Sequence, residues 1–147
     1  MRIKFVLILI ILSFSSFLNL KAQVKNSIIA KVGNQIITSY ELENEVKTIL
    51  FFSKIPLNQE NINVSKNTAI QSLVKKAIKS AEIKKYNVVE YNRIDLENQM
   101  KNLAKKINVP PDQLKKILEV NNINYDLLKE SFIINLTWNT LIFKIYK

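Results

Sequence analysis

The sequence predicts a mainly α-helical domain that opens with a short β-hairpin and continues through about five helices. β-branched runs flank the single glycine, Gly33, and capping residues precede apolar stripes that recur at helical spacing. One glycine in 147 residues is far below the usual share of about 7%. With 48% hydrophobic and 23% charged residues, the chain has the composition of one globular domain.

The hairpin is expected where two β-branched runs meet at a two-residue loop. These runs are residues 28–32 and 35–38, and Gly33-Asn34 lies between them. Glycine supplies a positive φ at the first loop position without a Cβ clash, and asparagine tolerates the left-handed region at the second. A tight turn therefore accounts for the placement of Gly33.

A helix is expected directly after the hairpin, because Thr38 and Glu41 have the spacing of a capping box. Ile37 and Leu42 can add a hydrophobic staple. The predicted order is a helix at 39–53, a polar loop at 54–63, a helix at 65–85, a helix from near 92, a short helix from 111 and a helix at 125–146. Asn87 is placed to end the second helix in a left-handed conformation, and Asn124 to cap the fifth.

The first 22 residues have the pattern of a cleaved signal peptide. Arg2 and Lys4 precede an apolar run, and a small residue, Ala22, stands at the expected cut. We expect cleavage near Ala22, so that the mature domain comprises residues 23–147. A retained membrane anchor is the alternative, but the apolar run is short for a span of ~20 residues.

Charge and composition exclude several classes of function. Removal of the leader would leave 19 basic and 12 acidic residues, a net charge of +7. In an exported protein this charge suits anionic lipid, anionic clients or solubility, and we expect no nucleic-acid partner. The chain has no histidine and no cysteine, which excludes a His-based triad and a thiol nucleophile. We expect no catalytic residue, metal ion or cofactor.

The predicted fifth helix is apolar on more than one side, and such a helix is expected to be buried on more than one side. The other helices could enclose it fully, or part of it could remain exposed for a client or partner. The candidate contact residues are Phe132, Leu136, Trp138, Phe143 and Tyr146. Phe51 and Phe52 are weaker candidates, because adjacent helical residues point about 100° apart and at least one of them could be exposed.

The segment IIAKVGNQIITSYELENEV resembles the start of the mature SurA-type periplasmic chaperones. The segment AIQSLVKKAIKSAEIKKYNV is similar to the long second helix of that family, with Asn87 in place of a usual glycine. The stretch from Asp95 to Leu136 resembles the helices that lead into the last helix of the family's N-terminal domain. The resemblance covers nearly all of residues 27–147.

The resemblance implies a periplasmic, ATP-independent chaperone module that binds unfolded outer-membrane proteins or extended peptides. Complete members continue into parvulin-type prolyl isomerase domains and a C-terminal segment that packs on the N-terminal domain. This sequence ends where the first parvulin domain would begin, so prolyl isomerase activity is not expected. The hairpin edge would then be unpaired. A homo-oligomer or a separate partner chain could cover it, and a non-catalytic assembly subunit is the alternative function.

Overall fold

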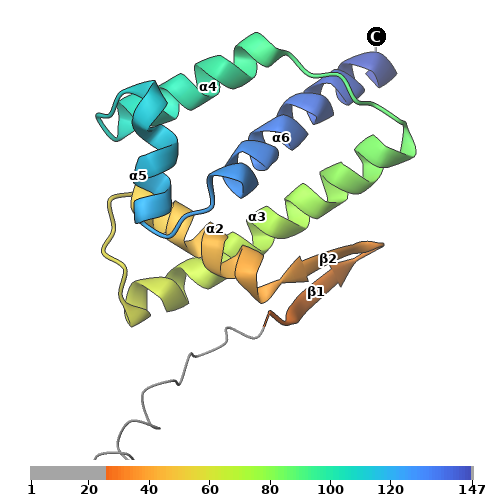
Figure 1. Ribbon diagram of the computed structural model, residues 1–147. Helices are drawn as coiled ribbons and strands as arrows, with labels where there is room; N and C mark the ends of the chain where they lie inside the picture. The colour runs from red at the N-terminus through yellow and green to blue at the C-terminus, as the bar shows by residue number, and fades with distance from the viewer. Residues whose placement is uncertain (1–25, 147) are drawn as a thin grey trace, which may run out of the picture.

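The computed structural model describes residues 26–146 and confirms a mainly helical domain with an N-terminal hairpin (Figure 1). The expected signal peptide lies outside the described residues. The elements are β1 (Ile28–Val32), β2 (Gln35–Thr38), α2 (Ser39–Phe52), α3 (Gln59–Lys85), α4 (Arg93–Lys106), the 3-10 turn η1 (Pro111–Gln113), α5 (Leu114–Val120) and α6 (Tyr125–Tyr146). The predicted order of elements is therefore confirmed.

The hairpin forms as predicted, but only one of its loop residues is left-handed. β1 and β2 pair antiparallel, with Val32 opposite Gln35 across the loop. Gly33 has φ +58°, whereas Asn34 keeps a negative φ, which corrects the expectation of a left-handed Asn34. Nothing lies within 4 Å of a Cβ built on Gly33, so backbone conformation and not space requires glycine there. A positive φ at the first loop position alone is the pattern of a type II′ turn.

The capping box that starts α2 is present with both of its hydrogen bonds. The Glu41 backbone N–H donates to Thr38 Oγ1 at 3.2 Å, and the Thr38 N–H donates to Glu41 Oε2 at 2.9 Å. These bonds satisfy two backbone donors that the first turn would otherwise leave unpaired. The hairpin and α2 are thus joined without a flexible linker.

Helix α3 begins six residues earlier than predicted. Asn58 is its cap, and the Asn61 N–H donates to Asn58 Oδ1 at 2.9 Å. The segment was interpreted as a loop because its first turns are polar and carry no apolar stripe. Ile62 packs against the cluster formed by Val46, Leu50 and Ala69, and the polar neighbours of Ile62 face solvent.

Four helices end with a residue that is left-handed although it is not glycine. The residues that follow the helix caps, with φ between 51° and 59°, are Lys54, Asn87, Asn108 and Asn122. In each case, the residue directly after the left-handed one donates its N–H back to a carbonyl of the helix, as Val88 does to the Ile83 carbonyl at 3.1 Å. This is the Schellman motif, in which glycine is the usual residue. Asparagine substitutes for glycine at three of the four ends, and the prediction for Asn87 is confirmed.

Helix α6 runs through the middle of the domain, between α3 and α4 (Figure 1). Its buried residues include Leu136 and Leu141. A second cluster joins α2, α4, α5 and the start of α6, and its buried members are Phe52, Ala104, Leu114, Leu118 and Ile123. Among the described residues, no helix is long and apolar enough to cross a membrane.

Candidate functional site

Phe51 and Phe52 lie in the core at the end of α2. Phe52 is buried in the cluster with Leu114 and Leu118, and Phe51 is partly buried against the same cluster. Their rings meet edge to face, with centroids 5.3 Å apart and an interplanar angle of 85°. The structure therefore brings neither of these weaker candidates fully to the surface. Adjacent residues do point in different directions, but α4 and α5 cover both directions.

Exposure along α6 differs between the sides of the helix and increases in its last turn. Leu136 is buried, and Phe132 and Trp138 are partly buried. Phe143 and Tyr146 are 61% and 81% exposed. The neighbouring helices therefore cover α6 on several sides, whereas the side that carries Asn135, Asn139 and Phe143 is exposed, as is the last turn. Of the five candidates on this helix, the structure brings only Phe143 and Tyr146 to the surface.

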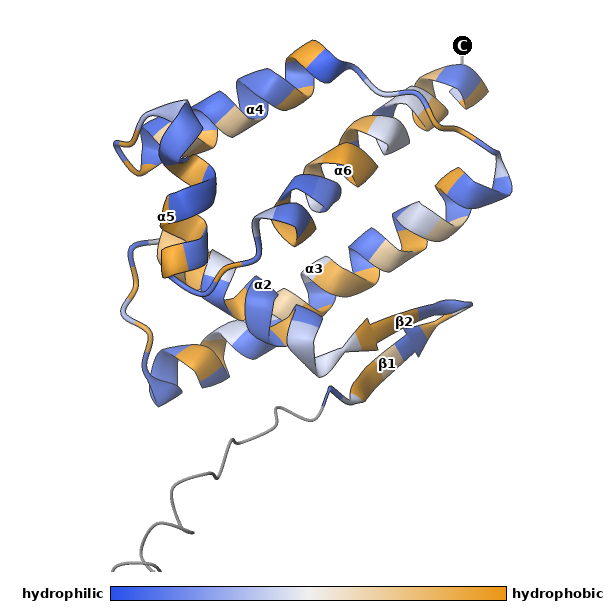
Figure 2. Cartoon of the chain, viewed as in Figure 1, coloured by the Kyte–Doolittle hydropathy of each residue, from blue (hydrophilic) through white to orange (hydrophobic). Residues whose placement is uncertain are grey.

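The last turn of α6 meets the connection between α3 and α4, and both segments expose large apolar side chains. Lys144 Nζ lies 2.9 Å from Glu90 Oε2, which holds the connection beside the helix end. Large exposed apolar side chains flank this ion pair on both segments. We call these exposed side chains together the terminal apolar surface; they are Val89, Phe143, Ile145 and Tyr146. Phe143 and Tyr146 lie on one side of the helix, and Ile145 lies on another. Figure 2 shows hydrophobic positions at this end of α6.

Val89 was missed from the sequence, although it is 83% exposed. It lies outside any helix or strand, so no periodic pattern singles it out. The only available signal was a pair of β-branched residues, Val88-Val89, directly after a helix end. Val88 is buried as the hydrophobic contact of that helix end, which leaves Val89 facing outward.

The outer edge of the hairpin is a second apolar region. In the sheet of the described residues, β1 pairs only with β2. A register shift falls between Ile28 and Ala30, and the side chains of Ile28 and Ile29 are both exposed. A strand edge with free backbone groups can pair with another chain, and a bulge limits such pairing. Ile37, on the inner face, is buried.

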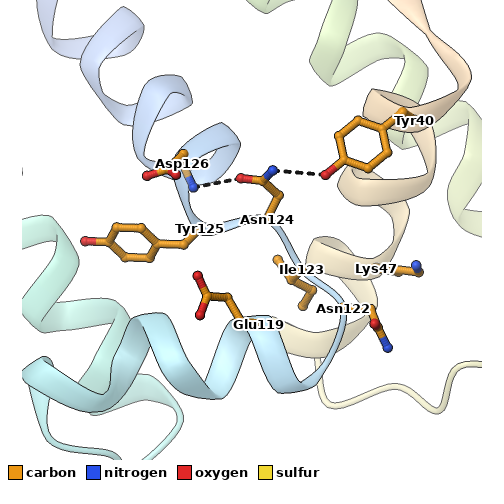
Figure 3. Close-up of a pocket in the computed structure, with 8 residues that line it drawn as sticks. All are labelled: Tyr40, Lys47, Glu119, Asn122, Ile123, Asn124, Tyr125 and Asp126. Atoms are coloured by element: carbon orange, nitrogen blue, oxygen red, sulfur yellow. Dashed lines mark hydrogen bonds between the residues drawn. The ribbon is translucent and has the colours of Figure 1, made fainter. Parts of the chain in front are cut away.

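A polar hollow of about 370 Å³ lies where α2, α5 and α6 meet (Figure 3). Asn124 is its centre. Its Oδ1 accepts from the Asp126 and Leu127 N–H groups at 2.9 and 3.1 Å, which confirms the predicted cap of α6. Its Nδ2 donates to Tyr40 Oη at 2.9 Å. One side chain thus caps α6 and attaches it to α2.

The backbone of Asn124 makes a further bond that sequence reasoning missed. Its N–H donates to Oδ1 of the buried Asn44, on α2, at 2.7 Å. These residues are 80 positions apart, so no local pattern could have linked them. The hydrogen bonds of the hollow fix the geometry between helices, which favours a structural role for it over a binding role.

The described residues hold no group of three or more acidic, histidine or cysteine side chains that could bind a metal ion. The exposed apolar side chains at the end of α6 and on the edge of β1 are the candidate contacts for a ligand. Their chemistry suits burial of apolar side chains from another polypeptide, because exposed apolar area gains free energy when it is removed from water.

Comparison with known proteins shows which family the chain resembles. The chain is 34% identical over 132 residues to Chaperone SurA of Buchnera aphidicola subsp. Schizaphis graminum (strain Sg). The match covers 84% of this chain and 29% of the length of that protein. No protein-family model matches the chain, and no solved structure matches it either. Together with the helical fold and its N-terminal hairpin, this identity shows that the chain is a SurA-like protein.

Proposed function

We propose that this chain is an ATP-independent periplasmic chaperone module that holds unfolded outer-membrane proteins or extended peptides. The observation that carries the proposal is the terminal apolar surface, on a chain similar to a named chaperone. Tyr146 and Phe143 offer rings that can cover apolar side chains of a client, and no bound nucleotide is needed for such contacts. Export through the predicted signal peptide would place the module among these clients.

The terminal apolar surface suits transient binding better than permanent assembly. It is composed of a few large side chains around an ion pair and is open to solvent. A small apolar area gives weak binding to any one segment, and an unfolded client offers many segments in turn. Weak contacts of this kind delay aggregation without trapping the client.

The test is aggregation of an unfolded outer-membrane β-barrel protein after dilution from urea, followed by light scattering without ATP. The purified chain should slow aggregation, and Phe143→Ser/Tyr146→Ser should lose most of that effect. Val64→Ser is the matched control, because Val64 is 74% exposed but lies on α3, away from this surface. Equal performance of the wild type and the double variant would contradict the assignment of the surface.

A second candidate function is a non-catalytic assembly subunit that docks on itself or on a separate partner chain. The exposed edge of β1, with Ile28 and Ile29, favours it, because a third strand could add there. Light scattering at micromolar concentration tests self-association, for which a monomer would be the contrary result. Co-purification from an envelope extract tests the version with a partner chain.

A further inference from the structure

A groove of about 480 Å³ lies between α4, η1 and the first turns of α6. It is separate from the terminal apolar surface, and Tyr125 divides it from the polar hollow, since its side chain lines both. Figure 3 shows the Tyr125 ring directed away from Tyr40. The volume is in the range of pockets that hold small ligands or single side chains.

The groove offers an apolar and aromatic lining. Leu96 is buried, and Met100 and Tyr125 pack against the core cluster from the side that faces the groove. Tyr91, on the other wall, is partly buried. An aromatic ring can stack on tyrosine, and the flexible thioether of Met100 can adapt to its shape.

The charges around the groove are unbalanced. Arg93, Lys101 and Lys129 line it, against one acidic residue, Glu97. Within residues 26–146, none of these three cations forms a hydrogen bond or ion pair through its side chain. Lysines elsewhere in the domain do form such pairs, as Lys76 does with Glu130 at 2.6 Å. The groove therefore attracts an anion more strongly than the chain's general positive charge would.

We propose that this groove binds an extended peptide at a position where a carboxylate stands beside an aromatic side chain. The ring lies against Tyr125 and Met100, and the carboxylate is held by Lys101 and Lys129 from opposite walls. The inference rests on the proposed function and deepens it. It gives the module a second contact with a client, selective for acidic–aromatic pairs, in addition to the unselective terminal apolar surface.

Binding of short labelled peptides to the purified chain tests this by fluorescence anisotropy. Four peptides in a Gly/Ser background carry an Asp–Phe, Asn–Phe, Asp–Ala or Lys–Phe pair and the same label. The Asp–Phe peptide should bind about tenfold more tightly than each of the others, with an affinity that falls as salt is raised. These comparisons need no change to the protein, so they do not depend on the folding of a variant.

A charge-reversal variant locates the site. The double variant Lys101→Glu/Lys129→Glu should bind the Asp–Phe peptide about tenfold more weakly than the wild type. Lys66→Glu, at an exposed position on α3, should leave the affinity unchanged. Equal binding of the Asp–Phe and Asn–Phe peptides, or equal loss in both protein variants, would overturn the proposal. If the chain still slows aggregation of the unfolded client, only the groove assignment fails. If it neither slows aggregation nor binds any peptide, both proposals fail.

Discussion

Replacement of Asn44 by alanine should destabilise the domain, because Asn44 provides a long-range link from α2 to the start of α6. The change removes Oδ1, which accepts the Asn124 N–H at 2.7 Å in a buried setting. A buried donor left without a partner costs about 1–3 kcal/mol. Alanine favours a helix interior over asparagine by roughly 0.5 kcal/mol, so the net loss should be about 0.5–2.5 kcal/mol.

The assay is urea unfolding followed by the fluorescence of Trp138, the single tryptophan. Asn98→Ala is the matched control, since Asn98 is an exposed asparagine in the interior of α4 and makes no hydrogen bond through its side chain within residues 26–146. The control should be stabilised by roughly 0.5 kcal/mol. If both variants shift the unfolding midpoint alike, the link between Asn44 and Asn124 contributes nothing and the reasoning is refuted.

The remaining predictions concern backbone conformation at Lys54 and Gly33 and burial at Phe52 and Phe143. Lys54→Gly should stabilise the domain by about 1 kcal/mol in urea unfolding, because Lys54 has φ 57°, at which its Cβ is strained and glycine is not. An unchanged or lower unfolding midpoint would contradict this. Phe52→Ala should lower the free energy of unfolding by about 3–5 kcal/mol, because Phe52 is buried, whereas Phe143→Ala should change it by less than about 0.5 kcal/mol. Similar losses in the two variants would show that the assigned burial is wrong. Gly33→Ala should lower the free energy of unfolding by about 1–2 kcal/mol, because alanine is strained at the positive φ of Gly33 although there is space for its Cβ. Gly33→Asn should lower it clearly less, and thermal unfolding can check this ranking.

Features set by short stretches of sequence were predictable. The Thr38–Glu41 capping box, the Gly33 turn and the caps at Asn87 and Asn124 each depend on residues within a few positions of one another. Local hydrogen bonds and backbone conformation decide such features, and so the residue types alone indicate them. The early start of α3 at Asn58 was missed because its first turns carry little apolar surface, so periodicity gave no signal.

Features set by the packing of distant elements could not be predicted. The sequence indicates that α6 is apolar on more than one side, but which of its side chains stay exposed depends on how α3 and α4 pack against it. Leu141 is buried and Phe143, two residues later, is exposed. These two positions lie about 200° apart around the helix, so they face different surroundings. Burial of Phe52 likewise depends on α5, whose position was not fixed by the sequence of α2.

Photo-crosslinking to an unfolded outer-membrane protein tests the central claim most directly. A photo-reactive phenylalanine derivative is placed at position 146 or 89, on the terminal apolar surface, and at position 64 or 120 as a control. The controls replace Val64 and Val120, which are 74% and 72% exposed but lie on other helices. The account predicts strong crosslinks from positions 146 and 89 and weak ones from 64 and 120. Crosslinks of equal yield at all four positions, or none at 146, would contradict it.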